Sequence, residues 1–123
     1  MSQTSTDLTH RRCVPCEGGV HKYSLKQARE QIELLPGWEL SADGRSIAKN
    51  WTVRDFAAGI DFLNRVARLA VEEGHHPDLH LSNYREMRIS LSTHAIEGLS
   101  DNDFILAAKI DQLPVDLKTS RPR

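Results

Sequence analysis

The sequence lacks most of the features that assign a protein to a class at first sight. Its 123 residues include two cysteines, Cys13 and Cys16, which are too few for a framework of disulfide bonds. The 16 lysines and arginines are balanced by 17 aspartates and glutamates, so there is no basic excess to bind the phosphates of a nucleic acid. Apolar runs are short, and no signal-peptide segment follows Met1. We expect a cytoplasmic protein that binds neither nucleic acid nor membrane.

Motifs that carry chemistry at a fixed spacing are also missing. The sequence contains no GxSxG nucleophile motif, no GxxxxGK[ST] phosphate loop and no HExxH zinc motif. Its length is typical of a single domain with one modest hydrophobic core. We therefore expect one domain whose chemistry comes from a different set of residues.

Residues 1–22 differ in composition from the rest of the chain. They are rich in serine, threonine, glycine and charge, show no apolar periodicity and contain CVPCEGG. A lone Cys-x-x-Cys could be half of a zinc site or a redox pair, but zinc needs two further ligands and a redox motif normally follows a strand. We interpret 1–22 as an arm or ordered loop without a helix, and 23–123 as the folded domain. Metal binding and a contact between subunits remain alternatives to an inert role for Cys13 and Cys16.

Three amphipathic helices are indicated by capping boxes, each followed by apolar residues at helical spacing. The boxes are Ser24 with Gln27, Thr52 with Asp55, and Ser100 with Asp103. The helices that follow end near Pro36, Gly74 and Pro114.

Four strands are indicated by short alternating runs that flank turn residues. The segment 38–51 has a turn at Asp43-Gly44 and predicts one hairpin. The segment 79–92 alternates apolar and polar residues around a turn at 83–86 and predicts a second. With the helices, the order is α-β-β-α-β-β-α. We expect an α+β two-layer sandwich, in which three helices cover one face of a four-stranded antiparallel sheet. Pairing of its open edges predicts a homodimer or a larger homo-oligomer.

The segment GHHPDLH, residues 74–80, holds three of the six histidines. His75 and His76 follow the end of the longest helix, and Pro77 favours extended backbone at His76, so we expect the two rings to diverge. His94 lies just after the last strand, which a four-stranded sheet can bring beside the same helix end. The pattern therefore predicts a pocket lined by imidazoles.

Structural roles alone could explain several of these residues. Adjacent histidines at a polar junction are often exposed or bonded to backbone, and His80 on an alternating strand fits a polar sheet face. Asp103 is favoured in a capping box whether or not it takes part in chemistry. Divergent rings at His75 and His76, without a Cys/His quartet, do not favour a metal site.

The segment HHPDLHLSNYREMRISLSTHAIEGLSDND resembles the signature of the pterin-4a-carbinolamine dehydratases. The matching positions are His75-His76-Pro77, Tyr84, His94 and Asp103. The resemblance extends over about residues 24–113 and includes LLPGWEL and RDFAAGIDFLNRVARLA, while CVPCEGG is similar to a leader of some bacterial members. The sequence departs from the family at Val71, where the family prefers an acidic or other polar residue.

The resemblance implies an enzyme that removes water from a 4a-hydroxytetrahydropterin to give quinonoid dihydropterin, in support of tetrahydrobiopterin recycling after an aromatic amino-acid hydroxylase. It implies that His75 and His94 are the acid-base pair and that His76 binds and orients the hydroxyl. Pro77, Tyr84 and Asp103 would contribute to substrate binding, with Asp103 also orienting an imidazole. Neither a metal nor a cofactor is implied, because the reaction is a proton transfer.

Three alternatives to this enzyme stay open. The same fold could serve as a dimerisation or regulatory module with little catalysis, or as an accessory protein in molybdenum-cofactor metabolism. A metal-dependent protein could instead use Cys13 and Cys16 with His10 or His21.

Overall fold

The structure, a computed structural model, describes residues 5–15 and 20–119. It contains the predicted helices and strands in the predicted order, together with a short N-terminal helix and a 3₁₀ helix. The elements are α1 (Ser5–Thr9), α2 (Leu25–Ile32), β1 (Glu39–Leu40), β2 (Ile47–Thr52), α3 (Phe56–Glu73), β3 (Asp78–Ser82), β4 (Glu86–Leu91), the 3₁₀ helix η1 (His94–Ile96) and α4 (Asp101–Asp111).

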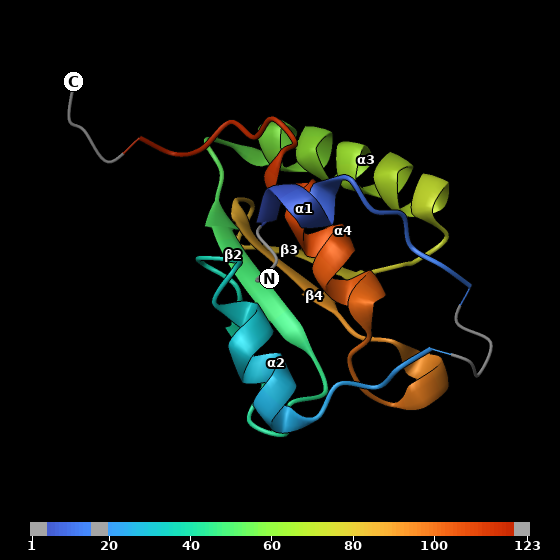
Figure 1. Cartoon of the computed structure of the whole chain (residues 1–123). Coiled ribbons are helices and arrows are strands. Elements are labelled where there is room, and N and C mark those ends of the chain that lie inside the picture. Colours follow the sequence, from blue (N-terminus) through green and yellow to red (C-terminus); the bar gives the residue numbers. More distant parts are fainter. Residues whose placement is uncertain (1–4, 16–19, 120–123) are drawn as a thin grey trace.

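The four strands form one antiparallel sheet in the order β1-β2-β4-β3. Side chains of β4 alternate, so that Met87, Ile89 and Leu91 are buried while Glu86 and Arg88 are exposed. Figure 1 shows the helices on one face of this sheet, which is the face that the buried side chains line. The predicted α+β two-layer sandwich is therefore confirmed.

Two of the three predicted helix starts are confirmed. The side chains of Ser24 and Ser100 accept backbone N–H groups in complete capping boxes at α2 and α4. The prediction for α3 is wrong, because Asp55 is its N-cap and accepts the N–H of Ala58, while Thr52 ends β2. The Thr52 hydroxyl instead donates to the Glu86 carboxylate across the sheet at 2.8 Å. Aspartate is also the stronger N-cap of the two residue types.

The amino-terminal arm contains a helix, so the expectation of none was wrong. Leu8 on α1 is fully buried in the core, and α1 packs against α4. A single apolar residue in a polar segment gives no periodicity, which is why the pattern of the sequence did not indicate this helix. Cys16 lies outside the described residues.

Residues 5–15 and 20–119 contain neither a membrane-spanning helix nor a cluster of metal ligands. None of the helices there is long and apolar enough to cross a membrane. No three histidine, cysteine or acidic side chains in the same ranges are grouped as a metal site would require.

Leu8→Ala is predicted to lower the free energy of unfolding by about 2 to 5 kcal/mol, the usual cost of truncating a fully buried leucine. Urea denaturation followed by circular dichroism measures this loss. Leu25→Ala is the matched control, because Leu25 is 38% exposed and its truncation should cost less. Equal losses in the two variants would show that the arm is not part of the core in solution.

Candidate active site

The end of α3 directs His75 into the protein. Gly74 follows the helix with a left-handed backbone (φ 67°), and its N–H donates to the carbonyls of Ala70 and Val71. The His75 N–H also donates to the Ala70 carbonyl, at 3.2 Å. This glycine-terminated turn reverses the chain, so His75 is only 6% exposed although it follows a surface helix.

The ring of His75 is held by a carboxylate from another helix, α4. His75 Nε2 lies 2.6 Å from Oδ1 of Asp103, which is fully buried in the first turn of α4. The second oxygen, Oδ2, accepts the Thr93 hydroxyl at 2.8 Å and the Ser100 N–H at 3.0 Å. Asp103 therefore caps its own helix and binds the imidazole at the same time.

This arrangement selects one tautomer of the neutral His75 ring. Both oxygens of Asp103 act as acceptors, so the proton of His75 is assigned to Nε2, which donates to Oδ1. The other nitrogen, Nδ1, is then the basic nitrogen of the ring.

Thr93 joins this network from the chain that follows β4. Its backbone forms an isolated bridge with Gly98, which closes the loop around η1. Its hydroxyl oxygen lies 2.8 Å from the Ser100 hydroxyl, and because Thr93 donates to Asp103, Ser100 is the donor in this pair. Sequence reasoning missed Thr93, whose only signal was its position next to His94.

The three motif histidines line one pocket of about 180 Å³, which we call the histidine pocket. Its lining residues are Gly74, His75, His76, Ser92, Thr93, His94 and Ala95. His76 and His94 are exposed side chains, whereas His75 forms the buried wall. The prediction that the last strand carries His94 to the end of the long helix is confirmed.

Other predicted residues lie elsewhere. Tyr84 has a left-handed backbone in the β3–β4 turn, at the opposite end of β4, and is 52% exposed. Tyr84 does not line the histidine pocket, and its contribution to substrate binding stays a prediction. Pro77 leads from His76 into β3 without lining the pocket, and Val71 is exposed on α3. His80 faces out from the sheet opposite Arg88, as predicted for a polar-face residue.

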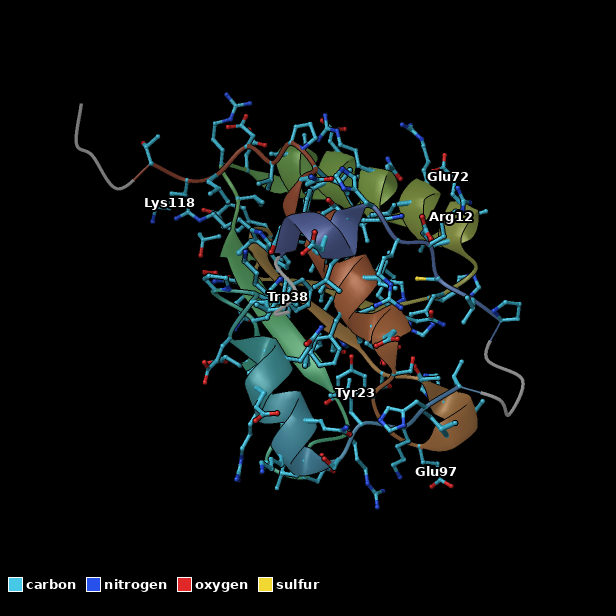
Figure 2. The ribbon with its side chains drawn as sticks, in the orientation of Figure 1. Arg12, Tyr23, Trp38, Glu72, Glu97 and Lys118 are labelled. Atoms are coloured by element: carbon cyan, nitrogen blue, oxygen red, sulfur yellow. The ribbon has the colours of Figure 1, made fainter. Side chains whose placement is uncertain are left out.

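The arm binds the residues that flank His75 and Asp103. The backbone of Val14 exchanges two hydrogen bonds with the Asn102 side chain, and the Cys13 N–H donates to Glu73 at 2.9 Å. Burial alone would raise the pKa of Glu73, but hydrogen bonds from Lys109 and the Cys13 N–H outweigh it and hold that pKa below its ordinary value. Figure 2 shows Arg12 beside this end of α3.

A group of three interacting side chains, centred on Asp101, lies at the start of α4 and does not line the histidine pocket. Asp101 accepts the Tyr23 hydroxyl and an Arg11 N–H. Burial, followed by the hydrogen bond to Asp101, raises the pKa of Tyr23 well above its ordinary value. Burial also acts to raise the pKa of Asp101, but the bonds from Tyr23 and Arg11 outweigh it and lower that pKa.

Comparison with known protein families shows to which family the chain belongs. The sequence model of the family described as "Pterin 4 alpha carbinolamine dehydratase" matches residues 21–113, a range that includes every residue lining the histidine pocket. The chain belongs to this family. The family resemblance expected from the sequence is confirmed.

Relatives in this family are similar to the chain over most of its length. It is 42% identical over 113 residues to pterin-4-alpha-carbinolamine dehydratase 2, mitochondrial, of Arabidopsis thaliana, a match that covers 89% of this chain and 60% of that protein. It is 47% identical over 107 residues to a Halorhodospira halophila protein that carries the same family name, covering 86% and 96% of the two chains.

Two solved structures share the fold. The transcriptional coactivator/pterin dehydratase of Brucella melitensis has a TM-score of 0.68 and 23% identity, covering 74% of this chain and 96% of that one. A pterin dehydratase-like protein described as a RuBisCO assembly factor in the alpha-carboxysome has a TM-score of 0.51 and 21% identity, covering 61% and 86%. At these identities the likeness shows the fold alone.

Asp103→Asn is predicted to change the tautomer of His75 and to cost about 1 to 3 kcal/mol of stability, because an amide has one oxygen for three converging donors. Ring ¹⁵N chemical shifts of His75 report the tautomer, and urea denaturation reports the stability. The matched control is Asp101→Asn in the same helix, which contacts Arg11 and Tyr23 instead. Wild-type ring shifts in Asp103→Asn would contradict the assignment of the Nε2 proton.

Proposed function

We propose that this protein dehydrates 4a-hydroxytetrahydropterin to quinonoid dihydropterin. Membership of the dehydratase family supports this reaction class. The observation that carries the proposal is the histidine pocket itself, in which the carboxylate-bound ring of His75 is joined by His76 and His94. Imidazoles are suited to a reaction that consists of proton transfers near neutral pH.

The chemistry needs one proton donor and one proton acceptor. The bond from C4a to the hydroxyl oxygen breaks, and this oxygen takes up a proton and leaves as water. The N5–H proton departs to a base, and its bonding electrons form the new double bond between N5 and C4a. The sum is loss of water, so no metal or redox cofactor is required.

His75 and His94 are the acid-base pair in this proposal. His75 acts through Nδ1, because Asp103 binds its Nε2, and His94 lines the same pocket. His76 binds the substrate and orients the departing hydroxyl. Asp103 is a positioning residue, since it contacts His75 and is itself fully buried. The metabolic setting that follows is recycling of tetrahydrobiopterin after an aromatic amino-acid hydroxylase in the cytoplasm.

His94→Ala is predicted to slow the enzymatic dehydration by about 10² to 10⁴, the usual contribution of general acid-base catalysis. The rate is measured as the loss of the transient ultraviolet absorbance of a 4a-hydroxytetrahydropterin. His94 is exposed, so its truncation should leave the fold intact. His80→Ala on the outer face of the sheet is the matched control and should keep wild-type activity. A wild-type protein that does not accelerate the decay over buffer would reject the proposal.

We also propose that the protein is a homo-oligomer that pairs through β3. This strand has β4 on one side and no other strand on its second side among the described residues, which leaves a row of backbone groups available for pairing. Light scattering after size-exclusion chromatography should give at least twice the mass of one chain. A monomer at micromolar concentration would contradict this pairing.

A further inference from the structure

Glu73, the last residue of α3, is an acidic side chain that takes no part in the proposed proton transfers. It lies two residues before His75, and its side chain is only 5% exposed. Its Oε2 accepts a bond from the ammonium group of Lys109 at 2.6 Å, and its Oε1 accepts the Cys13 N–H at 2.9 Å. Both oxygens are therefore engaged, one by α4 and the other by the arm, which fixes the direction of the Glu73 side chain.

We propose that Glu73 is a positioning residue for the dehydration, and that its bonds to Lys109 and to the arm set the His75 ring on Asp103. The proposal rests on the function proposed above and adds a residue to it. Glu73 does not line the histidine pocket. It acts through His75, whose backbone continues directly from the end of α3.

Two polar contacts join the end of α3 to α4. His75 Nε2 contacts Asp103, in the first turn of α4. Glu73 contacts Lys109, in the last turn of the same helix. At 1.5 Å of rise per residue, the two points of attachment lie about 9 Å apart along α4. One contact fixes a distance between two elements, and the second also limits the rotation of the end of α3 about the His75 ring.

The arm joins the same two helices. The Cys13 N–H donates to Glu73, and the next residue, Val14, exchanges two hydrogen bonds with the Asn102 side chain. Asn102 directly precedes Asp103 and is itself buried. One stretch of the arm therefore connects the end of α3 to the start of α4, and Glu73 is the residue at which the arm and both helices meet.

The charges around Glu73 make its contact with Lys109 a directional one. Burial alone would raise the pKa of Glu73, but the bonds from Lys109 and the Cys13 N–H, with the nearby charge of Arg12, lower it, so the carboxylate is ionised at neutral pH. Removing both charges of a buried pair from water offsets much of their attraction, and apolar residues of similar volume often replace such pairs without loss of stability. An apolar contact lacks the defined hydrogen-bond direction of an ammonium and a carboxylate. Positioning is therefore what this ion pair supplies and an apolar contact would not.

Glu73→Gln tests the proposal, because it removes the charge and keeps the shape of the side chain. It should lower kcat for 4a-hydroxytetrahydropterin about 10- to 100-fold, as expected when one reacting group is displaced by up to about 1 Å. KM should change less than about twofold, because Glu73 makes no contact with the substrate. Glu72→Gln is the matched control and should keep the wild-type kcat, since Glu72 is an exposed neighbour of the same type. Figure 2 shows Glu72 at the surface, near Arg12.

Variants of Lys109 separate positioning from stability. Lys109→Met should lower kcat as Glu73→Gln does, whereas Lys109→Arg keeps the ion pair and should keep most of the activity. Glu73→Gln combined with Lys109→Met should be no slower than either single variant, because all three lack the same contact. Urea denaturation should place the stability of this double variant nearer to the wild type than that of either single variant, because no unpaired charge is left buried. A low kcat in a protein that has regained stability would not follow from a purely structural role.

Ring ¹⁵N chemical shifts of His75 report the same contact without turnover. At a pH where the ring is neutral, Glu73→Gln should bring the Nδ1 and Nε2 shifts closer together, as a mixture of tautomers does when the bond to Asp103 weakens. Glu72→Gln should leave both shifts unchanged.

The outcomes separate the positioning role from the reaction. If Glu73→Gln kept the wild-type kcat or the wild-type ring shifts, or if the double variant regained kcat together with stability, positioning by Glu73 would be wrong while the dehydratase proposal stood. If the wild-type protein did not accelerate the dehydration, the dehydratase proposal would fail. The ring shifts would then decide on Glu73, since unchanged shifts in Glu73→Gln would overturn its role in holding His75.

Discussion

The hydrogen bond between His75 Nε2 and Asp103 Oδ1 is the interaction on which the candidate site depends. It connects the residue after the end of α3 to the first turn of α4, 28 positions further along the chain. The same carboxylate completes the capping box of α4, so the helix start and the imidazole are held by one side chain. Loss of Asp103 therefore affects fold and site together.

Burial makes this interaction sensitive to its neighbours. Asp103 is fully buried, so each hydrogen bond that it accepts replaces one that water would make in the unfolded chain. Thr93 and Ser100 supply the donors at Oδ2, and no buried side-chain nitrogen or oxygen among the described residues lacks a partner. Removing one donor would leave a buried acceptor unsatisfied, which costs more than a typical surface hydrogen bond contributes. Thr93 and Ser100 thus belong to the site although neither has the chemistry to move a proton at neutral pH.

The sequence predicted what depends on local patterns and missed what depends on distant contacts. Capping residues and periodicity located the helices and strands, and the Ser100 and Asp103 box was correct because its hydrogen bonds span three residues. The Thr52 cap failed because a tertiary contact, the bond to Glu86 across the sheet, competes for the same side chain. Tyr84 was assigned to substrate binding from its spacing in the motif, and spacing in sequence does not give its distance from the histidines in space. A hairpin turn lies at the far end of its strands.

The arm shows how far the folded unit extends beyond the family match, which begins at residue 21. Leu8 fills a fully buried position, so the core would be incomplete without the residues before 21. Farther along the arm, Cys13 and Val14 bind Glu73 and Asn102 through backbone groups, which any residue type except proline could supply at the N–H. Glu73 lies two residues before His75, and Asn102 directly precedes Asp103. The arm therefore holds together the two helix ends that carry the histidine and its carboxylate, and none of its described residues, 5–15 and 20–22, lines the pocket.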